Sequence, residues 1–142
     1  MAALTITASQ VLAPTDGSGN FVTGVAGADL TAGQSVYLDA STNTYKLADS
    51  NASQATAQAV GIATHAALTG QPVKLQGGRG GYLTLGAGAA PAVGTIYCVG
   101  ATAGSIVPSA DLTTGDYVTV LGVGATTNRI QLDVFISNSV KP

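Results

Sequence analysis

Residues 117–136 read YVTVLGVGATTNRIQLDVFI, and this stretch decides the class of fold. In its second half, Ile130, Leu132 and Val134 alternate with polar residues. A period of two places the apolar side chains on one face of a β-strand and the polar ones on the other. The first half is rich in valine, which also favours strands. The stretch therefore predicts β-structure rather than helix.

Similar short runs recur along the chain, and most are bounded by Gly, Asn, Asp or Pro, as expected of strands joined by turns. Helix signals are nearly absent; we expect one short helix at 51–58, capped by Asp49 or Ser50. The fold class is therefore all-β, a small antiparallel β-barrel or β-sandwich. The other predicted strands are QSVYLD, TYKLAD, AVGIAT, PVKLQ, YLTL and TIYCV.

The chain also resembles itself at a spacing of about 60 residues. Three landmarks recur in the same order, which predicts two similar β-meanders at roughly 30–75 and 90–135; chance recurrence of short apolar words is the alternative. Tyr37 and Tyr97 lie 60 residues apart, and the other two landmarks are offset by 61 and 57 residues. The matched segments are 33–38 with 94–99, 60–63 with 121–124, and 73–75 with 130–132.

Residues 1–27 read as an extended N-terminal arm, and 28–142 as a single β-domain. The arm contains APTDGSGNFVTGVAGAD, with turns expected at Pro14 and at 16–20. A segment of this composition is ordered only when something holds it. A partner subunit is the simplest candidate.

The content of ionisable residues is unusually low. Five Lys or Arg and seven acidic residues, all of them Asp, make up 8% of the chain, against about 25% in typical proteins. A surface with few ions is cheap to desolvate when another protein covers it. The net charge of −2 argues against binding to nucleic acid. No signal peptide or membrane-spanning segment is expected, so the chain reads as soluble.

Residues able to carry out catalysis are scarce. His65 is the only histidine and Cys98 the only cysteine, and neither has an obvious partner at a useful spacing. No nucleophile elbow or phosphate-binding loop motif occurs. We therefore expect no enzyme, no cofactor and no metal site, with His65 and Cys98 in structural roles.

The segment 77–81, Gly-Gly-Arg-Gly-Gly, is the most distinctive local feature. It is interpreted first as a flexible hairpin tip between PVKLQ and YLTL. Alternatively, Gly78, Arg79 and Gly80 form a contact loop whose guanidinium binds a carboxylate of a partner. Phosphate binding is a third interpretation, but such a loop normally opens a helix.

Two sets of residues faintly suggest ligand binding. The segments 16–20 and 39–43 could bind calcium, although position 12 of each loop lacks the Glu of an EF-hand, and turn formation explains their Asp and Asn residues. The five tyrosines could line a glycan-binding face, but aromatic residues on separate strands usually fill a core. These tyrosines are Tyr37, Tyr45, Tyr82, Tyr97 and Tyr117.

Six segments follow one another along the chain: DLTAGQSVYLD, TYKLAD, AVGIATHA, GQPVKLQGGRGGYLTL, PAVGTIYC and the closing 117–136. In this order they resemble the small capsid decoration (cement) proteins of bacteriophages. The similarity covers roughly 24–136, and it consists of turn and strand patterns rather than chemical signatures. The resemblance implies a structural protein without catalytic residues. It implies a location on the outer surface of the capsid in the virion, often as a homotrimer, where the major capsid protein is the partner and neighbouring capsomers are bridged.

For the arm, we expect Leu4, Thr5, Ile6 and Thr7 to lie extended and to add a strand to an edge of the capsid protein. We expect Gly78, Arg79 and Gly80 to contact the capsid or another subunit. The competing interpretation is a glycan- or receptor-binding β-module of a phage fibre or cell surface. A weaker one is an internal piece of a tail or connector.

Overall fold

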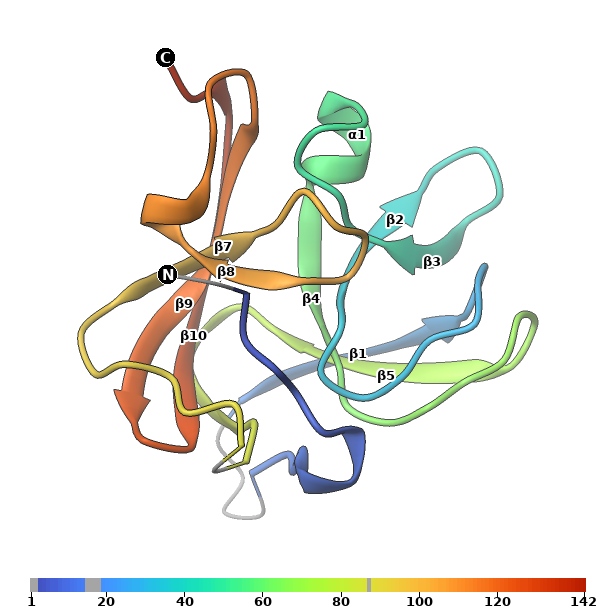
Figure 1. Cartoon of the computed structure of the whole chain (residues 1–142). Helices are drawn as coiled ribbons and strands as arrows, with labels where there is room; N and C mark the ends of the chain where they lie inside the picture. The colour runs from blue at the N-terminus through green and yellow to red at the C-terminus, as the bar shows by residue number, and fades with distance from the viewer. Residues whose placement is uncertain (1–2, 15–18, 87) are drawn as a thin grey trace.

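The computed structural model describes residues 3–14, 19–86 and 88–142. Within these residues the chain forms two five-stranded antiparallel sheets, which are not closed into a barrel, so the predicted all-β class is confirmed (Figure 1). The first sheet has the order β1-β5-β4-β2-β3 and the second the order β6-β10-β9-β7-β8. The strands are β1 (Asn20–Val25), β2 (Ser35–Asp39), β3 (Thr44–Leu47), β4 (Ala59–Ala63), β5 (Pro72–Gly77), β6 (Arg79–Thr84), β7 (Ile96–Val99), β8 (Ile106–Pro108), β9 (Tyr117–Thr126) and β10 (Arg129–Val140).

The two sheets repeat one topology. When β1 to β5 are matched in order with β6 to β10, the strand orders of the two sheets coincide. Neither sheet is a simple meander, because β1 lies beside β5 and β2 lies beside β4. The predicted ranges 30–75 and 90–135 therefore located the later four strands of each unit but left out β1 and β6, and the order of strands differs from a meander.

The repeat extends to the register of individual residues. Val36 pairs with Gly61 and Leu47, and the residues 61 positions later pair in the same way, Tyr97 with Gly122 and Pro108. A register shift follows at the same place in both sheets. The structural counterpart of Tyr97 is thus Val36 rather than Tyr37.

The last strand of each unit follows a shorter offset. Ile62 pairs with Gln76 in the first sheet, and its counterpart Val123 pairs with Gln131 in the second. Gln76 and Gln131 are therefore equivalent at an offset of 55, not the 57 expected from the sequence. The connection between β4 and β5 is six residues longer than that between β9 and β10.

A turn glycine precedes the second strand of each unit. Gly33 and Gly94 have φ values of +92° and +82°, which a side chain would strain. The Gly33 N–H donates to the carbonyl oxygen of Ala63, at the end of β4, at 2.8 Å. The Gly94 N–H donates to the carbonyl oxygen of Gly124, in β9, at 2.8 Å. The same sharp turn therefore enters β2 and β7.

Three apolar clusters hold the described parts of the chain together. The largest is shared by the two sheets, since Ile62 of β4 lies in it with Tyr97 and Leu132 of the second sheet. A second cluster, with Val36 and Leu75, covers the other face of the first sheet. A third, small cluster of Cys98, Val107 and Leu112 lies on the outer face of the second sheet.

The single short helix is smaller than the sequence predicted. Helix α1 spans Gln54–Ala57, within the expected range 51–58. Its N-cap is Ser53, not Asp49 or Ser50, because Ser53 and Thr56 form a reciprocal capping box. Asp49 instead accepts a hydrogen bond from the Asn51 N–H at 3.0 Å.

Strand β1 lies inside the range 1–27 that the sequence assigned to the arm. Its six residues pair with β5 along their whole length, from Asn20 with Gly77 to Val25 with Pro72. The part of the arm that precedes the first sheet is therefore the segment before Asn20, and the turn expected at 16–20 falls mainly outside the described residues.

Candidate interaction surface

His65 and Cys98 both make contacts within the fold. The His65 ring lies against β5, where its Nε2 accepts a hydrogen bond from the Lys74 N–H at 3.1 Å, and its Nδ1 lies 2.9 Å from the Ala66 carbonyl oxygen. Cys98 is fully buried, and burial raises the pKa of its thiol to about 11. A thiol that stays protonated at neutral pH is a poor nucleophile.

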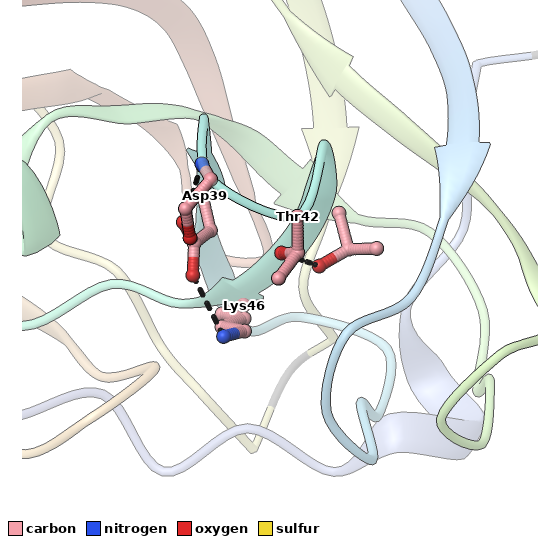
Figure 2. Close-up of polar contacts among 5 residues, drawn as sticks. Asp39, Thr42 and Lys46 are labelled. Atoms are coloured by element: carbon pink, nitrogen blue, oxygen red, sulfur yellow. Dashed lines mark hydrogen bonds and ion pairs between the residues drawn. The ribbon is translucent and has the colours of Figure 1, made fainter.

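The β2–β3 turn explains the Asp and Asn residues of 39–43. One Asp39 oxygen accepts from the Ser41 N–H at 3.0 Å and the Ser41 hydroxyl at 2.7 Å, while the other accepts from the Lys46 ammonium at 2.7 Å (Figure 2). Thr42 and Thr44 share a further hydrogen bond of 2.7 Å. The carboxylate thus closes a hairpin and holds a lysine. Within the described residues, no three His, Cys, Asp or Glu side chains gather as metal ligands.

These contacts predict a titration. The Lys46 ammonium, followed by the two Ser41 donors, lowers the pKa of Asp39 from 3.8 to about 2. Because the pKa is depressed, the contribution of this group to stability is present above pH 3.8 and is lost as the pH falls towards 2. Carbon-detected NMR should therefore give a midpoint near 2. Lys46→Met should raise the midpoint of the Asp39 titration more than Ser41→Ala does. Equal midpoints near 3.8 in the wild type and in both variants would contradict the described contacts of Asp39.

The glycine-rich segment 77–81 is not a hairpin tip, because β5 and β6 belong to different sheets. Gly78 is the point where the chain crosses from the first sheet to the second, and its carbonyl oxygen accepts from the Val134 N–H at 2.9 Å. Gly81 is packed so closely that a Cβ there would lie 2.5 Å from Gly19 Cα. Gly81 therefore lets β6 lie close to the residue that precedes β1.

Arg79 does bind a carboxylate, but one within its own chain. Its Nε lies 3.2 Å from Asp133 Oδ1, and both side chains are largely exposed. Gly78 and Gly80 are exposed as well. The expected role of this loop in contacting a capsid or subunit stays a prediction. Because exposed ion pairs contribute little to stability, Arg79→Ala should leave the melting temperature nearly unchanged, and any loss of partner binding then reports a direct contact.

The N-terminal segment lies against residues of both halves of the chain. Leu4 and Ile6 are half-buried and pack on the shared core, while Thr5 and Thr7 are exposed. The predicted alternation is therefore present, but its apolar face contacts this chain. Thr5 and Thr7 form the side of the arm that faces outward.

The outer face of the second sheet carries an apolar row across four strands. Backbone pairing aligns Ile96 of β7 with Val123 of β9, Val123 with Gln131 of β10, and Gln131 with Tyr82 of β6. Ile96 is 48% exposed and Tyr82 36%. These four residues are called the outer row. None of these four side chains carries a charge.

A second line of apolar residues runs beside the outer row. Cys98 pairs with Val120, and Val120 pairs with Phe135 on β10. Because Cys98 lies two residues after Ile96 on β7, both lines share one face of the sheet. Phe135 is 62% exposed. The apolar residues of this face therefore reach from β6 to the far part of β10, with the exposed Arg79–Asp133 ion pair between Gln131 and Phe135.

The equivalent row of the first sheet has the opposite character. Ser35, Ile62 and Gln76 occupy the places of Ile96, Val123 and Gln131, and all three are fully buried. The second sheet thus exposes an isoleucine where the first buries a serine. Buried polar and exposed apolar residues reverse the usual preference. Exposed aliphatic and aromatic side chains on a sheet face are typical of a surface that a partner covers.

The cationic groups beside the two rows are also repeated. Arg129 lies over the Tyr82 ring at 4.9 Å, and Lys74 lies over the Phe21 ring at 4.4 Å. Each cation is held against an aromatic face, where the interaction is favourable. Arg129 therefore lies beside the β6 end of the outer row, where Tyr82 is.

The outer row was not predicted as a site from the sequence. The sequence predicted that the tyrosines lie mainly in the core. This is confirmed for Tyr45 and Tyr97, which are 8% and 1% exposed, but not for Tyr82. The alternation in 129–136 shows two faces, yet it does not reveal which strands lie side by side. The internal repeat is the signal that could have found the outer row. It aligns Ile96 with Ser35, so an apolar residue stands in one unit where the other unit has a polar residue.

The chain has no significant match among protein-family models or curated proteins. In the described ranges, no helix has the length and apolar character needed to cross a membrane.

Proposed function

We propose that this chain is a structural virion protein that decorates and stabilises a bacteriophage head from the outside. It binds the major capsid protein, bridges neighbouring capsomers and associates as a homotrimer. Its body is a sandwich-like pair of sheets. The support comes from the resemblance of segments 24–136 to capsid decoration proteins and from the character of the surface.

The outer row is the observation that carries the proposal. Its side chains are apolar or uncharged, and Arg129 is already engaged with Tyr82. A surface of this kind loses little hydration energy when a protein covers it, because few ions are desolvated. Aromatic and aliphatic side chains at the centre of such a patch, with polar residues at its margin, are the usual anatomy of a protein interface.

The mechanism follows from selective binding. A protein that binds the expanded shell and not its precursor stabilises the expanded shell by mass action. The outer row supplies the main contact. The outward side of the arm, with Thr5 and Thr7, and the segment from Gly78 to Gly80 at the start of β6 supply contacts at the edge. Many copies on one head then add up to a large resistance to internal pressure.

The competing function is recognition of a glycan. Tyr82 favours it, because an exposed aromatic ring beside Gln131 and Arg129 is suited to stacking and hydrogen bonding with a sugar. Against it, Arg129 already lies over that ring. The protein interface is therefore preferred.

Co-sedimentation with phage heads tests the proposal. The purified chain should pellet with expanded empty heads and reach a saturating number of copies, and it should not pellet with unexpanded precursors. A glycan array serves as the parallel arm. Binding to saccharides without binding to heads would replace the proposal with the competing one.

A further inference from the structure

The two units link the edges of their open sheets in different ways. In the first sheet the edge strands are β1 and β3, and a parallel bridge of Ala26 with Tyr45 joins them. The hydrogen bond is donated by the Gly27 N–H to the Tyr45 carbonyl oxygen at 2.7 Å. The first sheet thus joins its own two edges.

In the second sheet the N-terminal segment makes the equivalent contact. Ile106 of β8 is the counterpart of Tyr45, 61 positions later, and its carbonyl oxygen accepts from the Leu4 N–H at 2.9 Å. At the other edge, Leu12 forms an antiparallel bridge with Thr84 of β6, through hydrogen bonds of 2.9 and 3.1 Å. Residues 4–12 therefore run from one edge strand to the other, and in Figure 1 this dark blue segment starts beside β8 and descends from it.

The side chains of this segment fit the gap between the edges. Leu4 and Ile6 pack on the shared core, and Val11 is only 6% exposed within it. A Cβ at Gly33 would lie 2.5 Å from Ile6 Cγ2, so a glycine there leaves room for Ile6. The fit is incomplete beside Leu4 and Ile6, where a hollow of about 180 Å³ reaches Gln34 and Ile106.

We propose that the groove between β6 and β8 is a binding site for an extended segment with the pattern of residues 3–12, and that the N-terminal arm occupies it as a strap that links these two edge strands. The recognition is that of strand addition: backbone hydrogen bonds at both edges give affinity, and pockets for alternate side chains give specificity. The site takes this segment from its own chain, and it takes the same segment from a second copy when its own is displaced.

The experiment uses the full chain and a fluorescent peptide of residues 3–14. Leu4→Asp with Ile6→Asp in the full chain displaces the strap, because both side chains lose their apolar contacts. The peptide should bind this variant at least about 10-fold more tightly than it binds the wild-type chain, whose groove is filled. Thr5→Asp with Thr7→Asp is the matched control in this peptide assay, since both side chains are exposed, and this variant should bind the peptide as weakly as the wild-type chain does. Equal binding to all three chains, or to none, overturns the proposal.

A milder variant covers the case in which the double aspartate variant fails to fold. Ile6→Ala should accelerate amide hydrogen exchange at Leu4 and Thr84 by about 10-fold, because the strap opens more often. Amides in the first sheet, such as that of Ile62, serve as the control and should not change. Exchange at Leu4 and Thr84 that is no faster than in the wild type contradicts the strap, whatever the result with phage heads.

Discussion

Gly122→Ala is expected to lower the free energy of unfolding by about 3 kcal/mol. A Cβ at this position would lie 2.2 Å from the Gln131 carbonyl oxygen and 3.1 Å from Leu132 Cα. Both atoms belong to the backbone of β10, so no side-chain rotation can relieve the clash, and the pairing of β9 with β10 has to shift. Urea or thermal denaturation measures the loss.

The internal repeat supplies a second test of this close approach. Gly61 is the counterpart of Gly122, and a Cβ there would lie 2.6 Å from the Gln76 carbonyl oxygen, the atom equivalent to that of Gln131. Gly61→Ala should therefore destabilise in the same direction and somewhat less. Gly88→Ala is the control, because its nearest neighbour would be at 3.6 Å, and it should stay within about 0.5 kcal/mol of wild type. If Gly122→Ala proves as harmless as the control, the described packing of β9 on β10 is wrong.

The second large effect concerns the outer face of the second sheet. Ile96→Asp combined with Phe135→Asp should weaken binding to expanded heads by about 100-fold, because each substitution places an unpaired carboxylate in a desolvated interface. The fold should survive, since the two side chains are already 48% and 62% exposed. Thermal denaturation checks the fold, and quantitative co-sedimentation measures the binding.

Val25→Asp with Leu68→Asp is the matched control for this experiment. These residues are 43% and 60% exposed, lie in the first half of the chain, and add the same charge. This control should decorate heads as the wild type does. Equal losses in both double variants would indicate that net charge, and not the outer face, governs binding.

Most strands were predictable from the sequence, because alternation and β-branched residues identify them one at a time. Eight predicted runs coincide with β2 to β7, β9 and β10. The two that were missed have weak local signals. Strand β8 has only three residues and ends in Pro108, and β1 lies in a Gly- and Thr-containing stretch that was taken as part of the arm. Both are edge strands, and an edge strand tolerates a proline because one of its two sides has no partner strand.

The arrangement of the strands was not predictable from local patterns. The run 77–81 predicts a sharp turn, but whether the next strand pairs with the previous one depends on contacts far along the chain, such as Asn20 with Gly77 and Asp133 with Arg79. The arm is a similar case. The alternation of residues 4–7 indicates that Leu4 and Ile6 lie on one side of the arm, but it does not indicate that this side packs on the chain itself.

The most direct measurement of the central claim is a cryo-EM structure of expanded heads saturated with the purified chain. The account predicts that Tyr82, Ile96 and Phe135 lie at the contact with the major capsid protein, while the first sheet is turned away from it. A decorated head in which this face points to solvent, or a head that stays undecorated at saturating concentration, would contradict the account.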